Sequence, residues 1–98
     1  MIEVRETPEF SRWLAALKDQ RAVLHLVRRI SRVAVGNPGD AKSVGGSVSE
    51  LRIDHGPGYR VYFTRRRQVL VILLCGGDKR TQSRDIRKAM EIAEKLED

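Results

Sequence analysis

The chain has 98 residues, enough for one small domain with a modest core, and we expect a single domain over residues 1–98. Apolar residues make up 41% and charged residues 33% of the sequence, which is typical of a globular protein and excludes a fibrous or disordered chain. The 19 lysines and arginines outnumber the 13 acidic residues, so a nucleic acid or an acidic protein is a natural partner.

The cysteine, histidine and glycine content gives no sign of a disulfide, a metal site or a cofactor. Cys75 is the single cysteine, which is typical of a reducing compartment, and we expect it to be buried as a small apolar residue. The two histidines, His25 and His55, show no metal-ligand spacing and are not expected to meet. The glycines are typical of turns and match no nucleotide-binding loop. No apolar segment approaches the roughly 20 residues of a membrane span, so we expect a cytoplasmic protein without a membrane segment.

Two amphipathic helices are predicted after a short strand at residues 2–5. Thr7 is a suitable N-cap for the first helix, with Pro8 at its first position. The apolar residues of this helix recur with helical spacing at Phe10, Trp13, Leu14 and Leu17. Asp19 is a suitable N-cap for the second helix, whose predicted buried residues are Val23, Leu26, Val27, Ile30 and Val33. The two helices would form a hairpin.

The opposite face of the second helix is basic. It carries His25, Arg28, Arg29 and Arg32, preceded by Arg21, and no carboxylate lies between Gln20 and Val35 to balance them. Such a face is either an ordinary solvated surface or a contact for a phosphate backbone. Arg28, Arg29 and Arg32 are therefore candidate contacts to nucleic acid.

Three strands and a helix are predicted in the second half of the chain. The strands cover residues 48–54, 59–65 and 68–75, and the third is apolar on both faces, which predicts a central strand covered on both sides. The helix begins after Gly76 and Gly77, with Thr81 or Ser83 as its cap, and its apolar positions are Ile86, Ala89, Met90, Ala93 and Leu96. The pattern predicts an α+β fold.

The first two of these strands place arginines together on one face. With a period of two residues, Leu51, Ile53, Val61 and Phe63 lie on the core side, and Arg52, Arg60 and Tyr62 lie opposite, on a surface that we expect to be open. A loop at residues 55–57 would put Arg52 directly across from Arg60, and opposed like charges destabilise a strand pair. Either an anion binds between them, or each pairs with a carboxylate such as Glu50 or Asp54.

The order of elements and several linked motifs resemble the RelE/ParE superfamily of toxins from toxin-antitoxin operons, and more closely its HigB-like, phage-derived "addiction module killer" branch. The motifs are Phe10 with Trp13-Leu14, Arg29-Ile30, Gly36-Asn37 with Gly39-Asp40, Glu50-Leu51-Arg52, Gly56 to Phe63, Gly77-Asp78-Lys79 and Thr81-Gln82. The resemblance implies a RelE-like fold, in which an N-terminal helical hairpin and a C-terminal helix pack on a mainly antiparallel sheet. It also implies a ribosome-dependent endoribonuclease that cuts translated mRNA without a metal, by attack of a ribose 2′-hydroxyl on the neighbouring phosphate.

Within this resemblance, four residues are candidates for the reaction. Arg52 and Arg60 would clamp the scissile phosphate, because a guanidinium holds two phosphate oxygens and stays charged. Lys79, at the family's Asp-Lys position, would either transfer a proton or only contact a phosphate. Tyr62 would stack on a base, take part in proton transfer, or simply pack. Lys42, Arg80 and Gln82 are further candidates for RNA contact, and the general base stays open, because the chain has no tyrosine or histidine after Tyr62.

The resemblance also implies partners and leaves two other functions open. A cognate antitoxin, of the HigA-like helix-turn-helix type, would neutralise the toxin, and the toxin would meet operator DNA only through the antitoxin complex. The ribosome and mRNA would be its targets. One alternative is a ParE-like poison of DNA gyrase that acts by binding a protein. The other is a non-catalytic relative that only binds its antitoxin.

Overall fold

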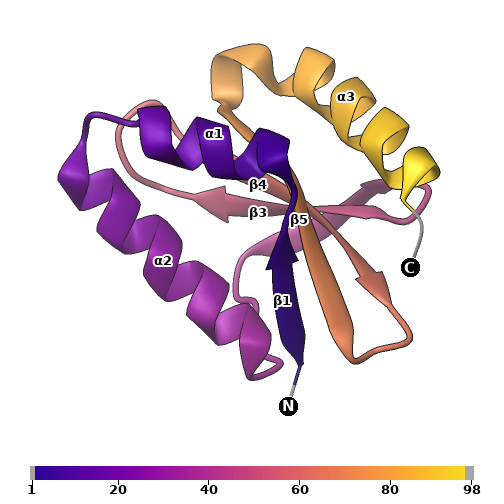
Figure 1. Cartoon of the computed structure of the whole chain (residues 1–98). Coiled ribbons are helices and arrows are strands. Elements are labelled where there is room, and N and C mark those ends of the chain that lie inside the picture. Colours follow the sequence, from indigo (N-terminus) through magenta and orange to yellow (C-terminus); the bar gives the residue numbers. More distant parts are fainter. Residues whose placement is uncertain (1, 97–98) are drawn as a thin grey trace.

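The computed structural model describes residues 2–96 and contains a five-stranded sheet with helices on both faces (Figure 1). The expected α+β class, with a helical hairpin and a C-terminal helix on a mainly antiparallel sheet, is confirmed. The elements are β1 (Glu3–Glu6), α1 (Pro8–Ala16), α2 (Gln20–Ala34), β2 (Ala41–Gly45), β3 (Val48–Ile53), β4 (Tyr59–Arg66), β5 (Leu70–Asp78), a 3₁₀ turn (Lys79–Thr81) and α3 (Gln82–Lys95).

The strands follow the order β1-β5-β4-β3-β2, in which β1 runs parallel to β5 and the other neighbours are antiparallel. Strand β2 was not predicted. It is a short edge strand that pairs with β3 through a turn at Gly45 and Gly46, both with positive φ, and it lacks the apolar alternation that reveals a strand. Edge strands of this kind are stabilised by their pairing partner rather than by their own sequence.

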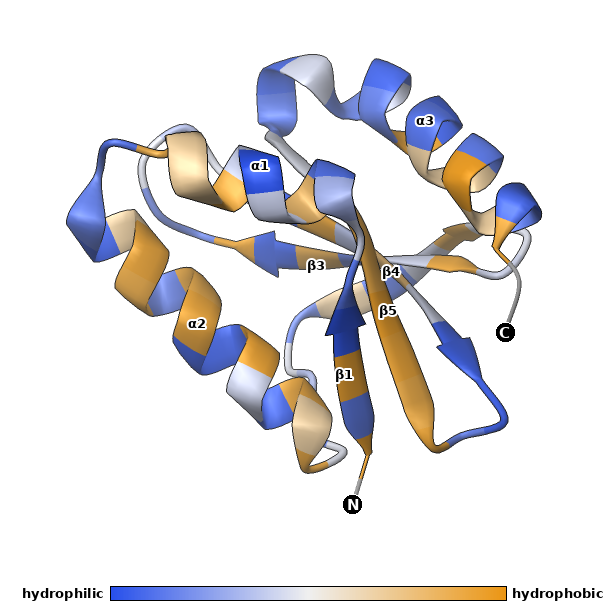
Figure 2. Cartoon of the chain, viewed as in Figure 1, coloured by the Kyte–Doolittle hydropathy of each residue, from blue (hydrophilic) through white to orange (hydrophobic). Residues whose placement is uncertain are grey.

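The core forms two layers, one on each face of the sheet. Helices α1 and α2 cover the face that carries Leu51, Ile53, Val61 and Phe63, as predicted, whereas α3 covers the face that carries Val48, Tyr62 and Ile72. Strand β5 contributes to both layers, since Val71 and Leu73 pack under α1 and α2 while Ile72 and Leu74 pack under α3. Figure 2 shows this strand as apolar along much of its length. The predicted central strand is therefore confirmed.

Both N-caps predicted for the helical hairpin are present. The Thr7 hydroxyl accepts a hydrogen bond from Phe10 N, and the Asp19 carboxylate accepts bonds from Arg21 N and Ala22 N. A cap such as Thr7 contributes about 1 kcal/mol to stability. The predicted burial of Val27 is wrong, since this side chain is exposed and Ala22 lies in the core instead. The small Ala22 carries too weak a hydrophobic signal to predict its burial.

Gly76 and Gly77 lie inside β5 and not in a turn, which corrects the prediction. A Cβ on Gly76 would lie 2.3 Å from the Trp13 ring, and a Cβ on Gly77 would lie 1.8 Å from Asp85 Oδ2. At these distances a side chain could be accommodated only if Trp13 or Asp85 moved. The two glycines therefore let α1 and α3 approach the backbone of β5 from opposite faces.

Candidate functional site

Arg52 and Arg60 form the centre of the site. They are directly paired positions of β3 and β4, on the α3 side of the sheet, as the period-two pattern predicted. Helix α3 begins at Gln82, so it covers the neighbouring part of this face and leaves the ends of β3 and β4 uncovered. The exposed fraction of the side chain is 35% for Arg52 and 12% for Arg60.

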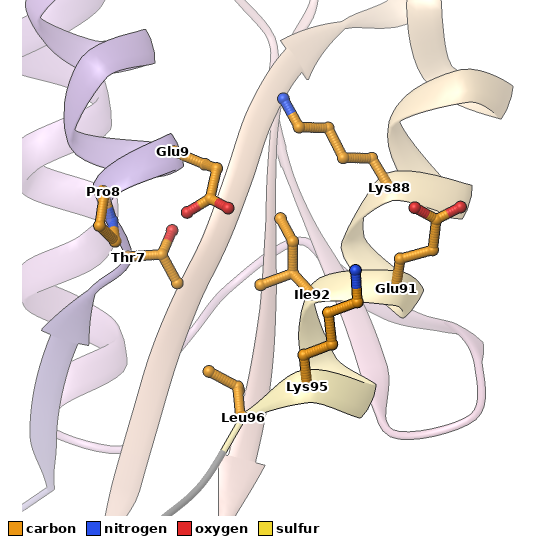
Figure 3. Close-up of a pocket in the computed structure, with 8 residues that line it drawn as sticks. All are labelled: Thr7, Pro8, Glu9, Lys88, Glu91, Ile92, Lys95 and Leu96. Carbon is orange, nitrogen blue, oxygen red and sulfur yellow. The ribbon is translucent and has the colours of Figure 1, made fainter.

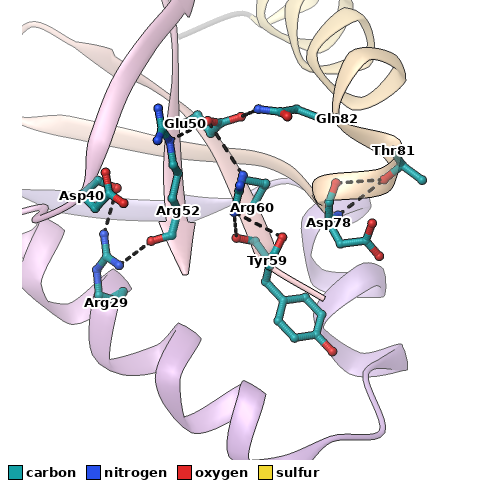
Figure 4. A network of polar contacts seen from close by, with 10 residues as sticks. Arg29, Asp40, Glu50, Arg52, Tyr59, Arg60, Asp78, Thr81 and Gln82 are labelled. Atoms are coloured by element: carbon teal, nitrogen blue, oxygen red, sulfur yellow. Dashed lines mark hydrogen bonds and ion pairs between the residues drawn. The ribbon is translucent and has the colours of Figure 1, made fainter. Parts of the chain in front are cut away.

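A buried carboxylate lies between the two guanidinium groups (Figure 4). Glu50 Oε1 is 3.3 Å from Arg52 Nε and 3.9 Å from Arg60 Nε, and Glu50 Oε2 accepts a 2.7 Å hydrogen bond from Gln82 Nε2. Glu50 itself is fully buried. The alternative in which the arginines pair with a carboxylate is thus realised, but a single acid is shared by two cations, so the group of three keeps a formal charge of +1.

Tyr62 occupies the expected face but not an open surface, which corrects that expectation. Its side chain has 0% exposure, because it packs beneath α3 with Ala89 and Ala93. Burial raises the pKa of its hydroxyl, and the nearby negative charge of Glu50 raises it further. The hydroxyl lies close enough to the Glu50 carboxylate to interact with it, although the contact does not have the geometry of a regular hydrogen bond. Tyr62 is therefore a packing residue, unable to stack on a base in this conformation.

Lys79 lies beside Arg60, across a glycine. The Lys79 backbone N–H donates to Gly58 O at 2.9 Å, and Arg60 Nη1 donates to Gly58 O and Tyr59 O. A Cβ on Gly58 would be 3.5 Å from both Arg60 Nη1 and Lys79 Cβ, and Gly58 has a φ of +80°. The positive φ favours glycine at this position, and the turn that it forms brings the two cations together.

Arg52, Arg60 and Lys79 line a common hollow of about 350 Å³, where β3 ends and β4 begins. Its other lining residues are Asp40, Asp54, Gly56, Pro57 and Gly58. The three predicted cations thus converge, although two exposed carboxylates share the hollow with them. The surface is mixed in charge, with cations next to candidate proton acceptors.

The 3₁₀ turn that carries Lys79 is held by Asp78, which the sequence analysis named only as part of the Gly77-Asp78-Lys79 motif. The Asp78 carboxylate accepts a hydrogen bond from Arg80 N at 2.8 Å and pairs with Arg80 Nη2 at 3.2 Å. This pairing lowers the pKa of Asp78 and raises that of Arg80. Arg80 is exposed, as an RNA contact requires, whereas Gln82 directs its amide to Glu50 rather than to solvent.

The basic face of α2 divides into exposed and structural residues. Arg28 and Arg32 are exposed. Arg29 instead donates to three carbonyl oxygens, those of Arg52 at 2.6 Å, Pro38 at 2.9 Å and Asp40 at 3.1 Å. Figure 4 shows the bonds to Arg52 and Asp40. Partial burial lowers the pKa of Arg29, and the nearby charge of Arg32 lowers it further. Arg29 therefore joins α2 to the strand that carries Arg52, and its contact with RNA stays a prediction.

Lys42 and the two histidines are the remaining residues that the sequence analysis discussed. Lys42 is exposed on β2, directly opposite Glu50 in the strand register. His25 and His55, which were not expected to meet, have ring centroids 4.7 Å apart, and His55 Nε2 lies 3.2 Å from Asp19 Oδ2. This contact brings the loop after β3 onto the start of α2, and no sequence signal predicted it.

Comparison with known proteins identifies the family. The model of the family described as phage derived protein Gp49-like (DUF891) matches residues 12–97. The chain belongs to the Gp49-like family. These proteins are a toxin-like family of the RelE and addiction-module killer group, which confirms the resemblance at that level. An uncharacterized protein of Haemophilus influenzae (strain ATCC 51907 / DSM 11121 / KW20 / Rd) is 50% identical over 95 residues, which cover 97% of this chain and 96% of that protein.

The Gp49-like chain has a second hollow on its α3 side, remote in sequence from the arginine pair. This groove of about 380 Å³ runs between the start of α1 and the end of α3 and is lined by Thr7, Pro8, Glu9, Lys88, Glu91, Ile92, Lys95 and Leu96 (Figure 3). It contains none of the predicted site residues. Within residues 2–96, no group of three or more His, Cys, Asp and Glu side chains is arranged to hold a metal ion, and no helix is long and apolar enough to cross a membrane.

Proposed function

We propose that this Gp49-like protein is the toxin of a type II toxin-antitoxin system and acts in the cytoplasm as a ribosome-dependent, metal-independent endoribonuclease on translated mRNA. Family membership supports the toxin assignment. The observation that supports the nuclease is the convergence of Arg52, Arg60 and Lys79, from β3, β4 and the 3₁₀ turn, on one hollow. Fixed cations of this kind suit the phosphate at which RNA is cleaved.

The proposed reaction needs a proton acceptor, a donor for the leaving oxygen and positive charge for the pentacoordinate phosphorane. Arg52 and Arg60 would hold the scissile phosphate, and Lys79 would contact the phosphate or donate a proton to the leaving 5′-oxygen. The carboxylates of Asp40 and Asp54, which line the same hollow, are candidates for the acceptor of the 2′-hydroxyl proton. The products would be a 2′,3′-cyclic phosphate and a free 5′-hydroxyl.

Other exposed cations of the chain would contact the rest of the RNA or the ribosome. Arg28, Arg32, Lys42 and Arg80 are the residues of this proposed surface, and all four are exposed. A toxin-like family implies an antitoxin partner in general. We assign the HigA-like helix-turn-helix antitoxin to this role, with operator DNA bound through the complex of the two proteins.

Mapping of cleavage ends by primer extension in a translating extract tests the proposal. Breaks within codons of translated mRNA, absent when translation is blocked, are expected. Induced DNA damage with intact transcripts would instead identify a gyrase poison. Overexpression without the antitoxin that produces folded protein and no growth arrest would identify a non-catalytic relative.

A further inference from the structure

The buried carboxylate of Glu50 has no role in the reaction proposed above. Glu50 does not line the hollow, so it is not placed to touch the RNA. We propose that Glu50 is a positioning residue that aligns Arg52, Arg60 and the turn carrying Lys79 for catalysis, an inference that rests on the proposed nuclease function. Three side chains from three elements converge on this one carboxylate (Figure 4).

The contacts of Glu50 orient the guanidinium of Arg52. Glu50 Oε1 engages Arg52 through Nε, and the Nη atoms of Arg52 make no hydrogen bond among residues 2–96. These two Nη atoms therefore remain available for the paired contact that a guanidinium makes with phosphate oxygens. A carboxylate that bound the Nη atoms instead would block the same contact. Glu50 thus binds Arg52 through Nε and leaves the two Nη atoms free to bind the ligand.

The same carboxylate offsets the repulsion between two opposed cations. Arg52 and Arg60 are direct cross-strand neighbours, and Arg60 is the more buried of the two. Arg60 Nη1 is fixed by Gly58 O and Tyr59 O, and Arg60 Nε has no hydrogen bond, with Glu50 Oε1 as its nearest anion at 3.9 Å. Without Glu50 the repulsion between the two guanidinium groups would increase, because Glu50 is the carboxylate that lies within ion-pair distance of both.

Gln82 extends this alignment to Lys79. Gln82 is the first residue of α3 and follows the Lys79–Thr81 turn directly, and its amide donates to Glu50 Oε2 at 2.7 Å. The bond ties the start of α3 to β3. The carboxylate therefore fixes all three cations of the hollow relative to one another, two directly and Lys79 through Gln82.

Glu50→Gln tests the inference, with Gln82→Met as a second variant and Glu94→Gln, an exposed position on α3, as the matched control. Urea denaturation first establishes that each variant is folded. Single-turnover cleavage of a translated mRNA is then measured against toxin concentration.

For Glu50→Gln we expect the rate at saturation to fall by about 100-fold, the loss caused by a misplacement of about 1 Å. The half-saturating concentration should stay constant or decrease, because one negative charge is removed next to the RNA. Gln82→Met should lower the saturated rate in the same way but less, and Glu94→Gln should behave as wild type.

A wild-type rate in folded Glu50→Gln would overturn the inference and leave the nuclease function standing, and so would a raised half-saturating concentration with an unchanged rate. If Glu50→Gln does not fold, a wild-type rate in Gln82→Met overturns the inference. If the wild-type protein cleaves no transcript, the proposed function fails. The NMR signals of the Arg52 and Arg60 Nε–H groups then show whether Glu50 positions the two arginines. Signals that coincide in wild type and Glu50→Gln overturn it, and signals that shift in Glu50→Gln but not in Glu94→Gln support it.

Discussion

Arg52 of β3 and Arg60 of β4 face each other directly across the sheet, with the Glu50 carboxylate 3.3 Å and 3.9 Å from their respective Nε atoms. Direct opposition of two arginines destabilises a strand pair, and a shared acid only partly offsets this. The remaining positive charge lies at the rim of a hollow, where a phosphate would complete its neutralisation. We therefore expect a bound phosphate to stabilise the folded protein.

Arg29 and Arg28 are neighbours in sequence, but their replacement should affect stability to very different degrees. Arg29→Gln should lower the free energy of unfolding by about 2 kcal/mol, because charge-assisted hydrogen bonds to three carbonyl oxygens are lost. Arg28→Gln, at an exposed position, should change it by less than about 0.5 kcal/mol. Urea denaturation of both variants measures the difference. Equal effects would show that Arg29 does not join α2 to β3.

Gly77→Ala should destabilise the junction between β5 and α3. The added Cβ would lie 1.8 Å from Asp85 Oδ2, so Asp85 and the start of α3 would have to move. Overpacking of this kind costs about 1–3 kcal/mol. Thermal unfolding checks the loss, with Ser83→Ala on the exposed side of α3 as the control. A Gly77→Ala protein as stable as wild type would contradict the close approach.

The sequence predicts the core of this fold well, because Leu51, Ile53, Val61 and Phe63 alternate with polar residues and the apolar run in β5 continues through both faces. Its failures have physical reasons. Strand β2 lacks apolar alternation and depends on pairing with β3. The burial of Tyr62 depends on how far α3 extends over the sheet, which is a tertiary property.

In the candidate site, too, the sequence predicts some features and misses others. Periodicity predicts the opposition of Arg52 and Arg60, since it depends only on register and loop length. The roles of Arg29 and Gln82 are set by backbone carbonyls and by a buried carboxylate from other elements, and no local pattern indicates them. The meeting of His25 with His55 likewise depends on how α2 packs beside the loop after β3.

The Asp19 carboxylate should make the free energy of unfolding depend on pH in the acidic range. A hydrogen bond from His55 is the main cause that lowers its pKa below 3.8, and the backbone N–H of Ala22 adds to it. Because the pKa of this carboxylate is lower in the folded state than in the unfolded chain, its charge stabilises the fold at pH values above the ordinary pKa of 3.8. This contribution is lost as the pH falls below 3.8. The free energy of unfolding of Asp19→Asn should therefore decline less steeply than that of wild type in this range. Parallel declines in urea titrations at several pH values would exclude the effect.

Cys75 should resist alkylation in the folded protein. Burial raises the pKa of its thiol to about 12, with the nearby Asp85 charge as a lesser cause, so the reactive thiolate is scarce at neutral pH. Mass spectrometry after treatment with iodoacetamide at about pH 8 should detect modification only in denaturant. Rapid modification of the native protein would show that the thiol is accessible.

The most direct test of the central claim is cleavage of a translated mRNA, mapped by primer extension, with Arg52→Ala, Arg60→Ala and Lys79→Ala compared with wild type. Each substitution should reduce cleavage by at least about 100-fold, the usual loss when one group that stabilises transition-state charge is removed. Circular dichroism should show folded protein, and Arg12→Ala, exposed on α1, should cleave as wild type. Wild-type cleavage by all three variants would contradict the account.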